Sequence, residues 1–196
     1  MAWIYKVGTI QTVTMSESER RNNATEFYNY FIKLNFSLSA ICGMLGNIER
    51  ESWLNPGMKQ GTSEKLGWGL IQWTPSTDLT DWCNSKGYNW YDGNAQCELI
   101  DSEGQGAQGV SGRWLPTKTY PYSWAQFSQL TDVNEATKAF LYERERSGVS
   151  ALADRLKYAV KWYEYFSGVI PPTPPTPPIP TTKKRMPIYM MIRRRY

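Results

Sequence analysis

The sequence predicts a mainly helical fold with one small β element, and three observations support this expectation. Apolar side chains recur at helical spacing in several segments, most clearly in residues 38–55, where Ile41, Met44, Leu45 and Ile48 form one stripe. Capping signals precede several of these segments. Residues 55–69 differ, because they contain four glycines, one proline and little periodicity, which favours loops or a small hairpin.

The helices can be placed in order from their caps and apolar stripes. Ser16 and Glu19 fit a capping box, in which each side chain accepts a hydrogen bond from the other residue's backbone N–H. Thr74 and Pro75 fit an N-cap followed by a first helical residue, and Gly87 is expected to end that helix. The expected helices span approximately residues 16–35, 38–55 (capped by Ser37 or Ser39), 74–85, 95–103, 132–146 and 150–166.

Composition divides the chain into four parts. Residues 1–13, rich in β-branched and aromatic types, are expected to form a short strand or an extended arm, and residues 14–168 the main domain. Residues 169–182 are a proline-rich linker, which is stiff and extended. Residues 183–196 hold apolar side chains between two basic clusters. This composition is typical of a disordered basic tail, and it also suits a peptide that docks on a partner protein, an anionic polymer or lipid.

The net charge of +4 is concentrated in residues 171–196, which contain six Lys and Arg and no acid. The remainder of the chain is slightly acidic, so the basic balance does not predict specific nucleic-acid binding. The chain has no histidine. This excludes Ser-His-Asp and Cys-His hydrolases and His-ligated zinc peptidases, and it leaves carboxylates, which suit glycoside cleavage without metal or organic cofactor.

Three cysteines, Cys42, Cys83 and Cys97, are odd in number and lack C-x-x-C spacing, so buried or free thiols are expected, although Cys83 and Cys97 could pair. The N-terminus lacks the pattern of a secretory signal, and no apolar run is long enough for a transmembrane helix. We therefore expect the protein to be made in a cytoplasm and to reach its place of action by a route other than a secretory signal.

Two carboxylates, Glu49 and Glu51, stand at the end of the most apolar helix. At 100° per residue both lie about 80° from the centre of the apolar stripe, on opposite flanks, while Arg50 points to solvent. A carboxyl at the edge of hydrophobic packing suits a general acid, because partial desolvation keeps its proton bound near neutral pH. A solvated or ion-paired surface carboxylate is the simpler interpretation of either residue, and helical geometry does not choose between the two.

The order of several short motifs resembles the signature of the lysozyme and soluble lytic transglycosylase superfamily. These motifs are Glu51-Ser52, then Leu54-Asn55-Pro56, then GWGLIQW at residues 67–73. The resemblance is closer to the lysozyme domain in tail-tip lysins of short-tailed phages that infect Gram-positive bacteria, and it runs from about Thr14 to about Phe166. It implies a lysozyme-like α+β fold with a small β wing near residues 57–73, and it assigns the catalytic acid to Glu51.

The resemblance further implies a phage muramidase that cleaves the β-1,4 bond between N-acetylmuramic acid and N-acetylglucosamine of peptidoglycan during tail-associated wall penetration. The alternatives are an endolysin for host lysis, a lytic transglycosylase, and a catalytically inactive virion or wall-binding protein. In addition to peptidoglycan, the resemblance implies phage tail proteins as possible partners through residues 183–196. It also implies that the protein is found in a virion, or in a host cytoplasm before its release to the cell wall.

A second carboxylate would stabilise or attack the sugar cation that forms when the glycosidic bond breaks. Candidates are Glu64 and Asp78, on either side of the GWGLIQW motif, and Glu143 in the sequence FLYERE. Solvated loop charge is the simpler interpretation of Glu64, and a structural ion pair with Arg144 or Arg146 is the simpler interpretation of Glu143.

Gln72 and Trp73 are the expected substrate contacts, because an amide bonds sugar hydroxyls and an aromatic ring stacks on sugar C–H faces. Trp68 and Tyr142 are further candidates for the same cleft. Gly67 and Gly69 flank Trp68 and would let backbone approach a ligand closely, or simply form a tight turn.

Overall fold

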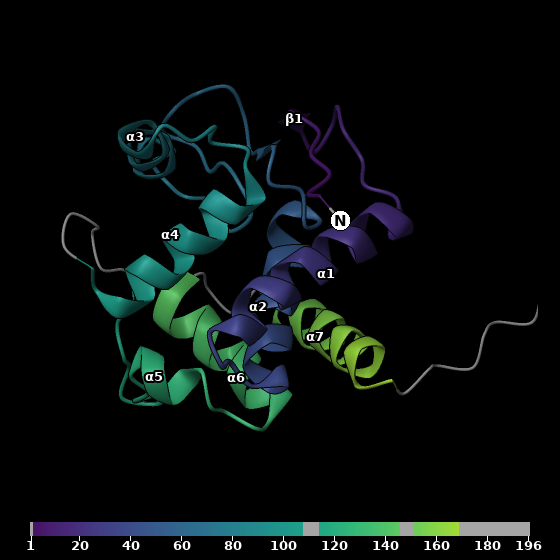
Figure 1. Ribbon diagram of the computed structural model, residues 1–196, viewed down its shortest axis with the longest axis vertical. Coiled ribbons are helices and arrows are strands. Elements are labelled where there is room, and N and C mark those ends of the chain that lie inside the picture. The colour runs from purple at the N-terminus through teal and green to yellow at the C-terminus, as the bar shows by residue number, and fades with distance from the viewer. Residues whose placement is uncertain (1, 108–113, 146–150, 169–196) are drawn as a thin grey trace, which may run out of the picture.

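The computed structural model describes residues 2–107, 114–145 and 151–168, and within them the chain is mainly helical, as predicted (Figure 1). The predicted linker and basic tail, and most of the glycine-rich loop at residues 104–112, lie outside the described residues. The elements are β1 (Gly8–Thr9), α1 (Glu17–Lys33), α2 (Leu38–Ser52), β2 (Met58–Lys59), α3 (Thr77–Lys86), α4 (Gly93–Gln105), α5 (Trp124–Phe127), α6 (Val133–Phe140), a π-helical turn η1 (Leu141–Glu145) and α7 (Leu152–Ser167).

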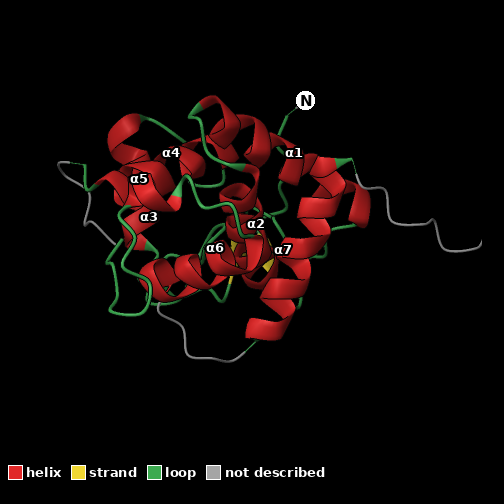
Figure 2. Ribbon diagram, turned by 90° about the horizontal axis from the view of Figure 1, so that it is seen from below, coloured by secondary structure: helices red, strands yellow, loops and turns green. Residues whose placement is uncertain are grey.

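Helix α2 lies at the centre of the fold, with α6 and α7 packed most extensively against it (Figure 2). Two glycines make this close packing possible. A Cβ at Gly46 would lie 2.4 Å from the carbonyl oxygen of Arg155 in α7, and a Cβ at Gly43 would lie 2.8 Å from the backbone of Ala136 in α6. Larger residues at these two positions would force the helices apart, so α2 is held at close range to both neighbours.

Most of the predicted caps are confirmed. Ser16 and Glu19 form the capping box of α1, and Gly87 ends α3 in the left-handed conformation. Of the two serines proposed for α2, Ser37 is the cap, because its hydroxyl accepts from the N–H of Ala40, whereas Ser39 donates to the Thr131 carbonyl.

The predicted start of α3 at Thr74 is wrong. The helix begins at Thr77 with Ser76 as its N-cap residue, after a cis peptide bond between Thr74 and Pro75. The Thr74 hydroxyl donates to the Gln72 carbonyl at 3.0 Å, so it serves the preceding turn and not the helix. The short helix α5, with its own capping box, was not among the helices expected from sequence.

The predicted β element near residues 57–73 is present but smaller than a wing. β2 pairs in parallel with β1, and two isolated antiparallel bridges join Lys59 to Trp68 and Trp68 to Trp73. One of the two strands is therefore supplied by the N-terminal arm.

Two buried asparagines attach this arm to the helical domain. The Asn23 side chain in α1 accepts from the N–H of Ile4 and donates to the carbonyls of Ile4 and Leu54. The Asn55 side chain similarly accepts from the N–H of Lys6 and donates to the Lys6 carbonyl. Each side-chain amide thus forms the hydrogen bonds with the arm's backbone that a neighbouring strand would otherwise form.

Cys42, Cys83 and Cys97 are free and buried, as predicted, so the optional Cys83–Cys97 pair does not form. Burial raises the pKa of all three thiols. In the part of the chain that the structure describes, no helix is both long and apolar enough to cross a membrane.

Candidate active site

Glu49 and Glu51, which helical geometry alone could not distinguish, have different environments in the last turn of α2. Glu49 is 1% exposed and accepts from Trp162 Nε1 at 2.7 Å and Lys161 Nζ at 2.8 Å, with Arg20 at 3.4 Å. The Glu51 side chain is 26% exposed. Because Glu49 is enclosed by donors from α1 and α7, Glu51 is the member of the pair that a substrate can reach.

Glu51 lies beside a buried guanidinium and not in the apolar environment that the sequence suggested. Arg155 of α7 is buried, and its Nη2 donates to Glu51 Oε1 while its Nη1 donates to Asn47 Oδ1 at 3.0 Å. The Asn47 amide in turn donates to the carbonyls of Gly43 and Thr137. This chain of hydrogen bonds fixes the position of the Glu51 carboxylate relative to α6 and α7.

The backbone turns sharply immediately after Glu51. Trp53 and Leu54 both adopt left-handed conformations, with φ of 54° and 60°. Such conformations are disfavoured for large side chains and persist only where the surroundings impose them, which occurs often at functional sites. The Asn55 side chain accepts from Gly57 N–H, so the turn leads directly into β2.

The GWGLIQW segment forms a tight turn beside β2. Gly69 has φ of 83°, and a Cβ there would lie 2.8 Å from Gln96 Oε1. The Gln96 side chain accepts from Leu70 N–H and donates to the carbonyls of Pro56 and Trp90. The close approach that the glycines allow is therefore made by the protein's own Gln96, which joins three segments of this region.

Three of the four predicted substrate contacts are partly exposed. The Gln72 amide donates to the Gly69 carbonyl at 2.7 Å, and Trp68 Nε1 donates to the Gly61 carbonyl at 3.1 Å. The ring of Tyr142, in η1, stacks on Tyr120 with centroids 5.3 Å apart. Each has a fixed orientation and some surface left for a ligand.

Trp73 does not fit its predicted role as a stacking surface. It is 1% exposed, and its Nε1 donates to Glu103 Oε1 at 3.1 Å. Its ring therefore belongs to the core and offers no face to a sugar in this structure.

Glu103 also pairs with Arg144, a contact that sequence reasoning missed. Arg144 Nε and Nη2 both donate to Glu103 Oε2, at 3.0 and 2.5 Å, and both residues are buried. Burial raises the pKa of Glu103, with Arg144 and Trp73 opposing the shift. No local sequence pattern indicates this ion pair, because 41 residues separate its two members.

The three carboxylates that the sequence offers for the second catalytic role occupy different environments. Glu143 is fully buried, accepts from Tyr122 N–H at 3.2 Å, and has an Oε2 atom without a hydrogen-bond partner. Burial raises the pKa of Glu143 to about 7. Glu64 is exposed on the loop before the GWGLIQW turn, and Asp78 lies in the first turn of α3. No hydrogen bond joins Glu64 or Glu143 to Glu51 in the described part of the chain.

Among residues 2–107, 114–145 and 151–168, no group of three or more histidine, cysteine, aspartate or glutamate side chains is placed to hold a metal ion.

Comparison with known proteins agrees with the resemblance read from the motifs. A family model described as phage tail lysozyme matches residues 22–166. Morphogenesis protein 1 of Bacillus phage B103 is 30% identical over 158 residues, which cover 79% of this chain and 42% of that protein. The chain therefore spans about two fifths of the length of this relative.

Proposed function

The chain belongs to the phage tail lysozyme family, and from this premise we propose that it cleaves the β-1,4 bond between N-acetylmuramic acid and N-acetylglucosamine in bacterial peptidoglycan. The observation that carries the proposal is the position of Glu51, a partly exposed carboxylate at the end of the central helix whose orientation Arg155 fixes. The corresponding biological role is that of a virion enzyme, which opens the bacterial wall so that the tail can pass.

In the proposed reaction Glu51 gives its proton to the glycosidic oxygen. The electron pair of the breaking C–O bond passes to that oxygen, and positive charge develops on the sugar left behind. Water then attacks this sugar in a hydrolase, whereas the sugar's own 6-hydroxyl attacks it in a lytic transglycosylase. In either case the attacking oxygen must lose its proton to a carboxylate, and Glu51, ionised by the first step, can accept it and return to its acid form. Arg155 acts as a positioning residue, because it binds one oxygen of the acid and is itself bound to Asn47.

Access distinguishes the candidates for a second carboxylate. Glu64 is exposed on its loop, so its carboxylate is accessible from solvent. Glu143 is fully enclosed and would have to leave its contact with Tyr122 to touch substrate. We therefore propose Glu64 for this role before Glu143.

For the glycan itself, we propose contacts with Gln72, Trp68 and Tyr142, which are all partly exposed. Trp73 is assigned a structural role beneath them, because it is buried against Glu103.

The test is mass spectrometry of soluble products from purified peptidoglycan digested by the wild type, by Glu51→Gln and by Glu49→Gln. Reducing-end muropeptides from the wild type but not from Glu51→Gln would support a muramidase, and 1,6-anhydro ends would indicate a lytic transglycosylase. Glu49→Gln is the matched control, since it should retain activity in proportion to its folded fraction. An inactive wild type would overturn the enzymatic proposal.

A second candidate function follows from the name of the relative in phage B103, which is a morphogenesis protein. On this alternative the chain contributes to virion assembly without catalysis. Phage particles that carry Glu51→Gln distinguish the two, because normal particles with a defect in wall penetration favour the enzyme. Unimpaired infection by these particles favours a structural component.

The proposal also assigns a role to each part of the chain. Residues 14–168 would act as the catalytic domain, residues 169–182 as a linker, and residues 183–196 as a segment that docks on tail proteins. An endolysin role predicts the opposite, namely that the protein acts free of the particle, so its presence in purified virions decides between them.

A further inference from the structure

We propose that a pocket between the N-terminal arm and the start of α4 is a second glycan-binding site, which takes an uncharged aminosugar unit. This proposal rests on the proposed function only for the identity of the polymer. The pocket is open to solvent, has a volume of about 380 Å³, and its lining includes Trp3, Tyr5, Asn89, Tyr91, Asp92 and Asn94. Such a volume falls in the range of small-molecule sites.

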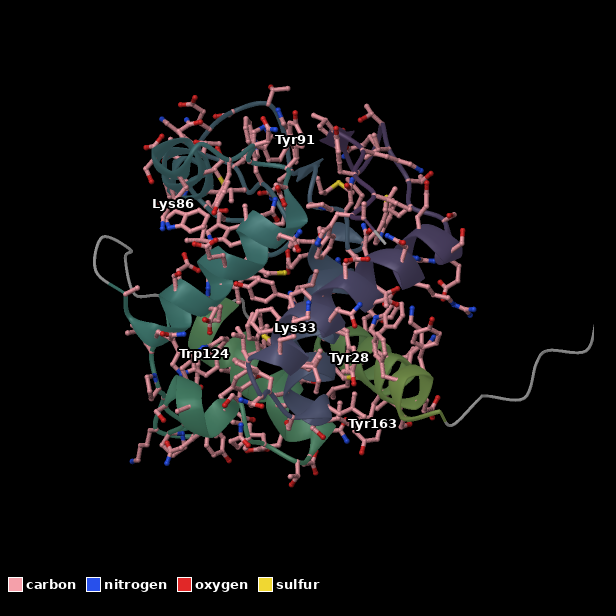
Figure 3. The ribbon with its side chains drawn as sticks, viewed as in Figure 1. Tyr28, Lys33, Lys86, Tyr91, Trp124 and Tyr163 are labelled. Atoms are coloured by element: carbon pink, nitrogen blue, oxygen red, sulfur yellow. The ribbon has the colours of Figure 1, made fainter. Side chains whose placement is uncertain are left out.

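The aromatic walls of the pocket are rigid. Tyr5 stacks on Tyr91 with ring centroids 4.6 Å apart, and Tyr5 remains 50% exposed. Figure 3 labels Tyr91 on the side of the molecule where Figure 1 places β1. The indole of Trp3 lies against the backbone of Gly93, where any added Cβ would come within 2.0 Å of the ring. Rings held in this way stack on a sugar face at little entropic cost.

The polar lining suits sugar hydroxyl and acetamido groups. Asn94 Oδ1 accepts from Trp3 Nε1 at 3.1 Å, which orients the amide so that its two N–H donors are available to a ligand. Asp92 Oδ1 accepts from the backbone N–H of Asn94 and Ala95 at the start of α4, and its other carboxylate oxygen remains as an acceptor. Asn89 is exposed at the rim and supplies a further amide.

The charge of the lining selects a neutral ligand. Asp92 is the charged side chain among the lining residues, and the described lining contains neither lysine nor arginine. An anionic wall polymer rich in phosphate would meet a like charge there. An uncharged N-acetylated sugar meets only hydrogen-bonding groups and ring faces.

Ring contacts extend from this pocket to the candidate active site. Tyr91 contacts Trp90 with centroids 5.6 Å apart, and Trp90 contacts Trp68 at 5.0 Å. All three residues are partly exposed. Since Trp68 belongs to the GWGLIQW turn, one glycan strand could contact both regions, and the arm pocket would hold the strand while its bond is cleaved.

The experiment is a titration of ¹⁵N-labelled Glu51→Gln protein with chitotetraose, followed by NMR. The inactive background prevents cleavage and leaves every lining residue intact. We expect shifts at the Trp3 indole N–H and the Asn94 side-chain amide. Tyr5→Ala and Tyr91→Ala in this background should weaken binding at these signals about tenfold, whereas Tyr5→Phe keeps the stacking face and should retain it.

Tyr88→Ala is the matched control, because Tyr88 is also an exposed aromatic residue before α4 but does not line the pocket. Shifts confined to Trp68 and Gln72 that Tyr5→Ala leaves unchanged would overturn the pocket while sparing the proposed muramidase. If the saccharide binds at Trp3 but the wild type releases no muropeptides from peptidoglycan, the pocket is supported and the proposed muramidase is overturned. Absence of any shift at Trp3 and Asn94 also overturns the pocket.

Discussion

The guanidinium of Arg155 contacts the carboxylate of Glu51 across 104 residues of sequence. The contact joins α7 to the end of α2, and the same guanidinium also binds Asn47 one turn earlier in α2. The planar guanidinium makes the two contacts with separate nitrogens, Nη2 and Nη1, whereas a lysine would have to make both from one nitrogen.

We expect Arg155→Gln to lower the free energy of unfolding by about 1–3 kcal/mol, because it removes charged hydrogen bonds to Glu51 and Asn47. It should also lower kcat by freeing the Glu51 carboxylate, and Arg155→Lys should restore neither property fully. Urea unfolding and wall-digestion rates measure the two effects. Arg50→Gln is the control, since Arg50 is 45% exposed and its pair with Asp154 should contribute less than about 0.5 kcal/mol. Equal effects of the two substitutions would refute this assignment.

Glu143 should make stability depend on pH. Burial raises its pKa from 4.5 to about 7, so between these values the unfolded chain loses this proton while the folded protein keeps it. The stability contributed by the protonated carboxyl is present below about pH 4.5 and is lost as pH rises to 7. Compared with Glu143→Gln, the wild type should lose up to about 3 kcal/mol over this interval.

Urea unfolding at several pH values between 4 and 8 measures that difference. Glu64→Gln serves as the control, because Glu64 is exposed and its replacement should leave the pH profile of the wild type unchanged. Parallel stability profiles for the wild type and Glu143→Gln would contradict the burial of a protonated carboxyl at this position.

Trp73→Phe should affect stability and not sugar affinity. The substitution removes the indole N–H that Glu103 accepts and leaves a small cavity in the core, which together cost about 1–3 kcal/mol. Trp68→Ala, at a partly exposed ring, should instead weaken chitotetraose binding by more than its loss of stability accounts for, since that loss comes from the contacts with Gly61 and Trp90. A weaker sugar affinity for Trp73→Phe at unchanged stability would return Trp73 to the binding surface.

Asn23→Ala should release the N-terminal arm. It leaves the N–H and carbonyl of Ile4 and the carbonyl of Leu54 without their partner, and we expect a loss of about 2–4 kcal/mol. Limited proteolysis should then cut within residues 2–9, and chitotetraose affinity at the arm pocket should fall. Asn22→Ala, which loses an exposed bond to the Ala2 carbonyl and a bond to Asn23 Oδ1 but leaves every contact of Asn23 with Ile4 and Leu54 in place, should cost only about 1 kcal/mol. An arm that stays protected in Asn23→Ala would show that the Asn55 contacts and β1 suffice to hold it.

Features that depend on near neighbours were predictable from the sequence. The capping box of Ser16 and Glu19 and the glycine that ends α3 involve residues within one turn of each other. The start of α3 could not be predicted in this way, because the Ser76 hydroxyl donates to the carbonyl of Glu64 in a loop twelve residues earlier. A cap predicted from Thr74 and Pro75 alone cannot include that contact.

The same limit applied to the candidate site. A helical wheel places Glu49 and Glu51 symmetrically, and only the helices packed on each flank make one of them a buried partner of Trp162 and the other a neighbour of Arg155. The simpler interpretation of Glu143 was an ion pair with Arg144 or Arg146, but Arg144 pairs with Glu103 of α4, and Arg146 lies outside the described residues. Which charges meet in the core follows from tertiary packing and not from spacing along the chain.

The three buried thiols give the fold an independence from redox conditions. No disulfide holds Cys42, Cys83 or Cys97, and burial keeps each of them protonated and shielded from reagents in the folded protein. The same folded state should therefore form in a reducing cytoplasm and persist in an oxidising medium outside the cell. A thiol-reactive dye would label the cysteines only when the domain opens, so the labelling rate reports how often it does.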